Sequence, residues 1–160
     1  MRESVELFIR SVHLIAAIVW FGGVIFSTFI AMPILQRSLP PQSLLAVHNR
    51  FRALIRLMIH VLLTTGAMVF FIVAWNSGFF AQQNGSDFKT YMLTFVAKLG
   101  AFGVMALFWG LYSSLYRRHL EAIPPDDKTY HSPSPYINVW RGLMLVAGLI
   151  VFALTLLLKN

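Results

Sequence analysis

The sequence contains no cysteine and few charged residues, and both absences narrow the chemistry open to the protein. Without cysteine there can be no disulfide framework, thiolate metal site or cysteine nucleophile. Only 12% of the 160 residues are charged, against about 25% in soluble domains, whereas 58% are hydrophobic. Asp and Glu together number 6, which argues against chemistry that needs paired carboxylates. This composition indicates an integral membrane protein.

The charge that remains is strongly positive, with a formal net charge of +7. Basic residues in excess can bind nucleic acid, or they can flank membrane-spanning helices on the cytoplasmic side. In so apolar a chain the second explanation is the simpler one. We therefore expect the lipid bilayer, and no nucleic acid, as a partner.

Four apolar segments are long enough to span a bilayer, which takes about 20 residues each. They cover about residues 7–35, 53–75, 92–116 and 139–158. The first is too long for the apolar region of a cleaved signal peptide, so we expect it to be retained. The sequence predicts an all-α protein whose residues 1–160 form a single integral membrane domain, an up-down-up-down bundle of four transmembrane helices.

The loops between these segments differ in basic residues, and the richer side is expected to be cytoplasmic. That side holds Arg37, Arg50, Arg52, Arg56, Arg117, Arg118, Lys128 and Arg141, and the other holds Arg2, Arg10, Lys89 and Lys159. Both termini are then predicted on the non-cytoplasmic side. The expected location is a bacterial inner (cytoplasmic) membrane, crossed several times.

His13 is the most unusual residue of the first segment, because an imidazole in hydrocarbon is costly unless it is used or satisfied. Ala16, Ala17, Trp20 and Gly23 follow it on one side of the helix. Small residues allow close helix packing, in which a neighbour would hydrogen-bond His13. They can equally leave space for a flat ligand, such as a porphyrin or a quinone-like molecule.

Lys98 lies in the third segment at a depth similar to that of His13. Its long side chain can reach back to the membrane surface. Alternatively, its ammonium group can meet an anionic group, such as a propionate of a porphyrin. The second interpretation makes Lys98 a candidate cofactor-binding residue beside His13 and Trp20.

Further candidate iron ligands lie deeper in the bundle. His60 and Met144 are at similar depths on the second and fourth segments, and His and Met are both axial ligands of haem iron. Met68 is nearer the level of His13. Because His13 and His60 differ by about 13 Å along the helix axis, they indicate two sites, or one site and one structural histidine.

Basic residues at the cytoplasmic edge also have two interpretations. Arg52 and Arg56, one helical turn apart, either anchor the helix on lipid phosphates or clamp the carboxylates of a bound anion. We retain both arginines as candidate cofactor-binding residues. His48, His119 and His131 are interpreted as residues of the membrane interface, since no metal-binding spacing joins them.

The first three segments resemble the HemJ and CopD-like family of integral membrane proteins. "SVHLIAAIVWFGGVIFSTFIAMPIL" is similar to the first helix of HemJ-type protoporphyrinogen oxidases, with matches at His13, Trp20 and residues 21–23. "HNRFRALIRL" resembles the entry to their second helix, and "FVAKLGAFGVMALFWGLYSSLYRR" their third, with Lys98 at the matching lysine. The fourth segment departs, because Asn138 is not followed by Glu-Pro, and His60 has no counterpart.

The resemblance implies a four-helix bundle that binds b-type haem, with His13 as an iron ligand or catalytic residue and Lys98 in the same site. It implies an oxidoreductase that converts protoporphyrinogen IX to protoporphyrin IX and passes electrons to a membrane acceptor. Two alternatives stand beside it: a CopD-like copper uptake or resistance protein, and a small accessory subunit of a larger membrane redox complex. A homo-oligomer is compatible with each.

Overall fold

We analysed a computed structural model, which describes residues 2–76, 86–124 and 133–157. Within these ranges all regular structure is helical, as predicted. The elements are α1 (Arg2–Phe26), the π-helix η1 (Ser27–Ala31), α2 (Met32–Ser38), α3 (Pro41–Asn76), α4 (Ser86–Glu121) and α5 (Pro135–Leu157).

Three helical stretches are long and apolar enough to cross a membrane, namely Glu3–Ser38, Pro41–Ile72 and Lys89–Glu121. A shorter apolar helix, Pro135–Val151, adds to them. The helices extend beyond the predicted apolar segments. A helix of 36 residues, such as α3, is about 54 Å long, whereas the hydrocarbon core is about 30 Å thick. The polar residues at both ends therefore continue the helices rather than ending them.

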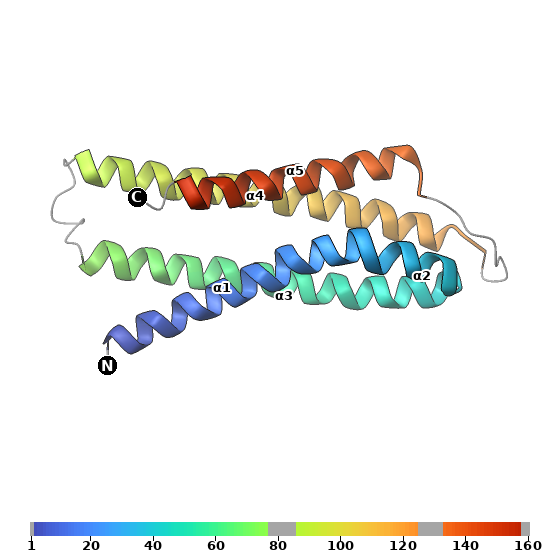
Figure 1. Ribbon diagram of the computed structural model, residues 1–160, viewed down its shortest axis with the longest axis horizontal. Coiled ribbons are helices and arrows are strands. Elements are labelled where there is room, and N and C mark those ends of the chain that lie inside the picture. The colour runs from blue at the N-terminus through green and yellow to red at the C-terminus, as the bar shows by residue number, and fades with distance from the viewer. Residues whose placement is uncertain (1, 77–85, 125–132, 158–160) are drawn as a thin grey trace.

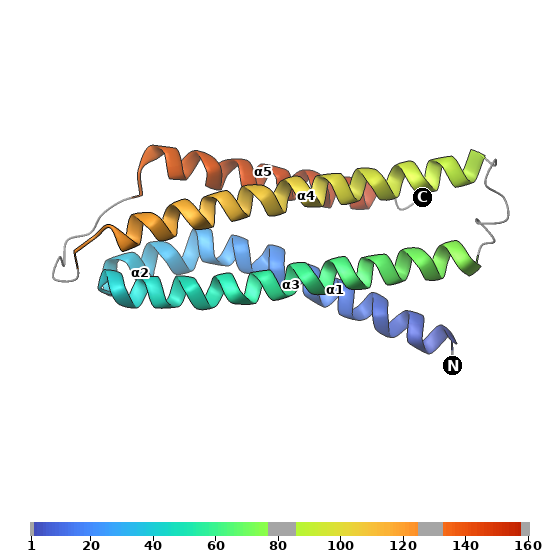
Figure 2. The ribbon, with the colours of Figure 1, turned by 180° about the vertical axis from the view of Figure 1, so that it is seen from behind.

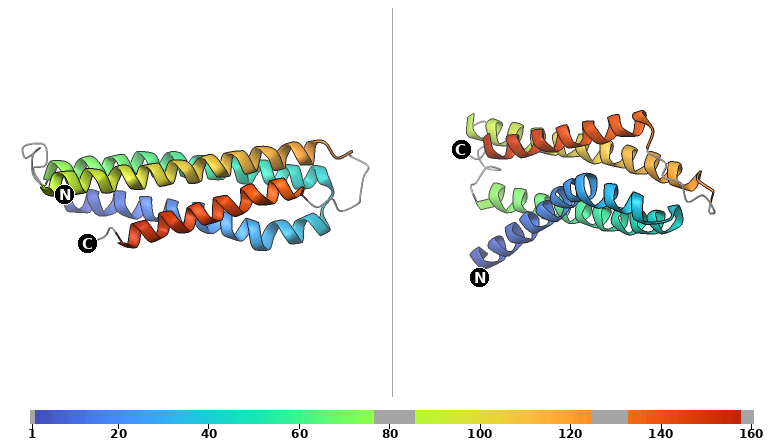
Figure 3. Two further views of the ribbon diagram at one scale, coloured as in Figure 1. Left: turned by 90° about the horizontal axis from the view of Figure 1, so that it is seen from above. Right: turned by 45° about the vertical axis from the view of Figure 1, so that its right-hand side comes forward.

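The long helices lie side by side along one axis of the molecule (Figures 1 and 2). α1 packs on α3, α3 on α4, and α4 on α5. The first half of α1 diverges from α4 and α5 toward the N-terminal end of the molecule (Figure 3). On α3, His48 contacts Ser113 and Phe70 contacts Phe95, so α3 and α4 are antiparallel.

A π-helix interrupts the first long helix just before Pro33. Proline has no backbone N–H and its ring collides with the carbonyl four residues earlier, so a regular helix cannot continue through it without adjustment. The N–H of Met32 bonds to the carbonyl of Ser27, five residues back, which widens this turn. The helix continues to Ser38, Leu39 is extended before Pro40, and α3 starts at Pro41.

Several buried residues of α3 are separated by three, four or seven positions, which is the spacing of a helix face packed against neighbours. The buried positions include Leu44, His48, Ile55, Leu62 and Thr65. The apolar members belong to two core clusters. One is centred on Trp20, Ile55, Met105 and Met144, and the other on Met32, Leu44, Tyr116 and Ile137. His48 and Thr65 bring polar groups into this face, one toward each end of the bundle.

Candidate functional site

His13 lies on the buried face of α1, between Ile9 and Ala16, and packs against α3. Its Nδ1 atom is 2.8 Å from Oγ1 of Thr65. A Cβ atom on Gly66 would lie 3.3 Å from Cε1 of the imidazole. The absence of a side chain at Gly66 therefore makes room for the ring between the helices.

The hydrogen bonds of Thr65 determine which nitrogen of His13 carries the proton. Thr65 donates its one hydroxyl proton to the carbonyl of Val61, at 2.6 Å. Its oxygen therefore accepts from Nδ1–H of His13, and the carbonyl of Leu62 also interacts with the imidazole. In the neutral ring this leaves the lone pair on Nε2 available. Histidines that bind metals are typically fixed in this way through the other nitrogen.

Lys98 occupies the same face of α4 as residues that pack inside the bundle. Three residues before it, Phe95 packs on Phe70 with ring centroids 4.1 Å apart. Four residues after it, Phe102 packs edge-on against Trp20 at 4.7 Å. Lys98 is itself partly buried. It therefore lies between two aromatic contacts of the bundle interior.

The antiparallel register of α3 and α4 places Lys98 and Thr65 at about the same height. Since Thr65 bonds to His13, three helices contribute a polar residue to one level of the bundle. We call His13, Thr65 and Lys98 the outer polar level. The sequence-predicted pair of His13 and Lys98 is thus at one height, and Thr65 is a member that sequence reasoning missed.

Trp20 and Gly23 contribute to helix packing. Trp20 is buried in the first core cluster, and its Nε1 has no hydrogen-bond partner among the described residues. A Cβ atom on Gly23 would be 3.5 Å from the ring of Phe51. Gly23 is about 15 Å along α1 from His13, so it allows close approach of α3 at another level.

His60, Met144 and Met68 occupy three different environments. His60 is exposed on α3 and donates from Nδ1 to the carbonyl of Arg56 at 2.6 Å. Met144 is 1% exposed inside the first core cluster, whereas Met68 is 47% exposed. Over the described ranges, no three His, Asp or Glu side chains gather into a metal-binding group.

Arg52 and Arg56 belong to the opposite end of the bundle from the outer polar level. From Thr65 to Arg52 the rise along α3 is about 20 Å. Arg52 interacts electrostatically with Arg117, Arg56 and Glu121. These arginines therefore form a region of their own and do not join the His13 site.

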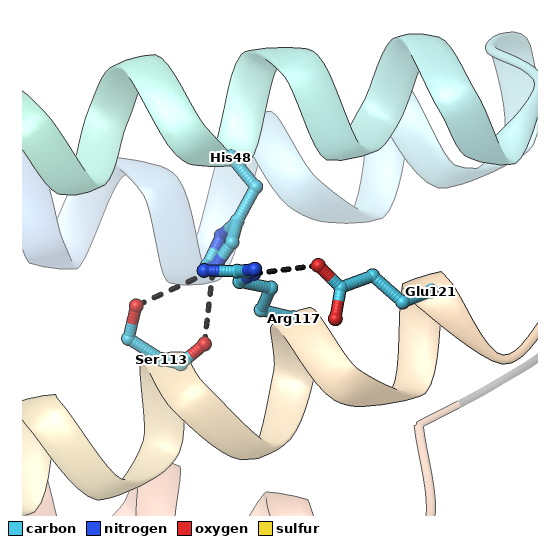
Figure 4. Close-up of polar contacts among 4 residues, drawn as sticks. All are labelled: His48, Ser113, Arg117 and Glu121. Carbon is cyan, nitrogen blue, oxygen red and sulfur yellow. Dashed lines mark hydrogen bonds and ion pairs between the residues drawn. The ribbon is translucent and has the colours of Figure 1, made fainter.

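His48 is a buried polar residue whose environment the sequence did not reveal. It is 3% exposed, and its Nε2–H donates to the carbonyl of Ser113 at 3.2 Å and lies 3.3 Å from the Ser113 hydroxyl (Figure 4). The ring of Tyr116 meets it edge-on at 5.0 Å. Gln36 donates to the hydroxyl of Tyr116 at 2.7 Å. In the sequence, the helical spacing of His48 from Leu44 and Ile55 could have indicated that His48 lies on the same face as these buried residues. His131 lies outside the described residues.

No family model, curated protein or solved structure matches this chain. The resemblance to the HemJ and CopD-like family therefore stays a prediction. The function is therefore inferred from the geometry of the outer polar level and of the region around Arg52 and Arg56.

Proposed function

We propose that the protein is a membrane redox protein that binds b-type haem through His13. The observation that carries this proposal is the hydrogen bonding of the imidazole. Nδ1–H is held by Thr65, whose own proton is used by Val61, and Nε2 is left as a potential ligand. Haem iron accepts such an imidazole, and the bound group would supply one-electron chemistry.

Other residues near this level fit an anionic, planar cofactor. Lys98 offers a positive charge from α4 at the height of His13. Trp20, two turns after His13, has a buried indole N–H without an acceptor among the described residues. A buried donor of this kind is satisfied by a ligand oxygen such as that of a carboxylate. His13 would hold the iron, and Lys98 and Trp20 would bind the periphery.

The family resemblance extends this proposal to a reaction. An enzyme of the protoporphyrinogen oxidase type removes hydrogen from protoporphyrinogen IX and transfers electrons to an acceptor in the membrane. His13 and Lys98 would then lie beside the substrate as well as the cofactor. Oxidation of protoporphyrinogen IX must consequently be assayed in addition to haem binding.

We also propose an up-down-up-down topology with the arginine-rich end in the cytoplasm of a bacterial cell. Among the described residues that end carries Arg37, Arg50, Arg52, Arg56, Arg117, Arg118 and Arg141, and the other carries Arg2, Arg10 and Lys89. The protein lacks cysteine, so single cysteines can report sidedness. In intact cells, a membrane-impermeant maleimide should label Ser4→Cys and leave Gln42→Cys unlabelled.

The test of haem binding is an absorption spectrum of protein purified from haem-replete cells. We expect a Soret band that is lost in His13→Ala and weakened in Thr65→Val, because support by a neighbouring acceptor raises ligand affinity by about 10-fold or more. His60→Ala is the matched control, since it removes an exposed histidine with the same Nδ1 arrangement. It should leave the band unchanged.

Two results would overturn the proposal. One is a folded, colourless protein, and the other is a Soret band that depends on His60 and not on His13. Copper content should be measured on the same preparation. Stoichiometric copper without haem would favour the CopD-like alternative.

A further inference from the structure

Three arginines gather on the seam between α3 and α4, at the end of the bundle away from His13. We call Arg52, Arg56 and Arg117 the arginine cluster. Arg52 interacts electrostatically with both other arginines and with Glu121. Glu121 is the one carboxylate among these charges, and it pairs with Arg117 at 2.6 Å. Among the residues that the structure describes, two positive charges of the cluster are therefore without an acidic partner.

One nitrogen of the Arg52 side chain also lacks a hydrogen-bond acceptor among the described residues. This nitrogen, Nε, is buried. A buried donor without an acceptor is destabilising, and more so when the group is charged. A guanidinium group binds the oxygens of phosphate or carboxylate through two parallel hydrogen bonds. The cluster thus offers the hydrogen-bond donors and the positive charge that such an anion needs.

The depth of the cluster identifies the source of the anion. Arg52 immediately precedes the apolar segment 53–75, and Arg117 immediately follows the segment 92–116. Long side chains that begin at the ends of apolar segments reach into the headgroup layer just outside the hydrocarbon core, where the lipid phosphates lie. Arg56 is one turn deeper and exposed, and its long side chain can extend back to this layer.

The seam beneath the cluster is fixed. His48, one turn before Arg52, bonds to Ser113, one turn before Arg117. Figure 4 shows Arg117 rising from α4 toward the His48 ring, with Glu121 on its other side. Because His48 joins the two helices, Arg52 and Arg117 are held near each other before any ligand arrives. Such preorganisation reduces the entropy lost on binding.

We propose that Arg52 and Arg117 bind the phosphate group of an anionic phospholipid in the arginine-rich leaflet. General attraction between basic residues and an anionic membrane depends on charge and not on which arginine supplies it. A specific site depends on the two arginines that meet at the seam. The inference is independent of haem, since it concerns another level of the bundle.

Native mass spectrometry of the protein in detergent micelles, titrated with phosphatidylglycerol, tests the site. We expect one lipid to bind saturably, about 10-fold more weakly in Arg52→Gln, because a charge-assisted bond contributes about one such factor or more. Arg117→Gln should weaken binding severalfold. The matched controls are Arg50→Gln and Arg118→Gln, which remove exposed arginines close by on the same helices. Equal losses in all four variants would overturn the proposal.

Two further arms complete the test. Arg52→Lys keeps the charge and removes the planar fork, so it should show a loss between those of wild type and Arg52→Gln, and it serves if Arg52→Gln does not fold. Phosphatidylcholine should bind more weakly than phosphatidylglycerol. If millimolar inorganic phosphate binds in an Arg52-dependent way and no lipid is retained, the assignment to a phospholipid is wrong.

Discussion

His13 and His48 are two histidines of one bundle with opposite surroundings. Each lies on an inward-facing position of its helix, and each meets a hydroxyl-bearing residue of the neighbouring helix. His48 is 3% exposed, donates to the Ser113 carbonyl and has the Tyr116 ring edge-on against it. His13 is only partly buried, and its hydrogen bond to Thr65 is made through Nδ1.

The difference separates a structural histidine from a candidate ligand. At His48, packing and hydrogen bonding together join α3 to α4. At His13, a threonine fixes the ring and a glycine accommodates it, so one nitrogen is free for a further partner. The residue type is the same, and the residues opposite it on α3 and α4 decide the role. The following variants test this distinction between the two histidines.

The largest effect is expected for His48→Ala. The change removes a buried ring and leaves its polar partners on α4 unsatisfied, so we expect a loss of about 3 kcal/mol in the free energy of unfolding. Unfolding in sodium dodecyl sulfate, followed by far-ultraviolet circular dichroism, measures it. His60→Ala is the control, and its exposed position predicts a change within about 0.5 kcal/mol. Similar losses in the two variants would contradict the structural role of His48.

Thr65→Val tests how His13 is held. Valine keeps the shape of threonine and removes the acceptor for Nδ1–H, so we expect a loss of about 1 kcal/mol. Nitrogen-15 NMR of labelled histidine should show His13 protonated at Nδ1 in the wild type and a mixture of tautomers in the variant. Thr64→Val is the neighbouring control, because its hydroxyl bonds to the His60 carbonyl on the exposed face. An unchanged His13 spectrum in Thr65→Val would refute the assignment.

Gly66→Ala tests the room made for the ring. Alanine is more favourable than glycine inside a helix by about 1 kcal/mol. Gly103→Ala should show this gain in full, because a Cβ atom there would meet nothing within 4 Å. At Gly66 the Cβ atom would press on His13, so the gain should be offset. The same unfolding assay compares the two. If Gly66→Ala raised the free energy of unfolding by as much as Gly103→Ala, the His13 ring would be able to move aside without cost, which would contradict the expected crowding.

The sequence predicted the helices from their apolar segments because the length of such segments is set by the bilayer. It did not predict their ends, since polar residues beyond the hydrocarbon continue the helix, as the start of α3 at Pro41 illustrates. His13 could be identified because a polar residue is conspicuous in an apolar run. Thr65 could not, because threonine is ordinary in a helix and its partner is distant in the sequence.

His48 and His60 show why the remainder of the site was not predictable. His48 precedes the apolar segment 53–75, where a histidine is expected at the membrane interface, and its contact with Ser113 requires the pairing of α3 with α4. His60 lies within that segment and was as conspicuous as His13, yet its side chain is exposed. The direction of a side chain depends on the register of the neighbouring helices. The length of an apolar segment carries no information about that register.

The smallest effect is expected for Ser113→Ala, which divides the contact of His48 into its two parts. The backbone carbonyl of Ser113 still accepts from Nε2–H, and only the hydroxyl at 3.3 Å is lost. We expect a loss of about 0.5 kcal/mol, measured by the same unfolding assay. Ser114→Ala, at the adjacent and less buried position, controls for the effect of alanine on the helix. A loss as large as that of His48→Ala would transfer the stabilising role from the backbone bond and ring packing to the hydroxyl, and His48 would then depend on a side-chain partner as His13 does.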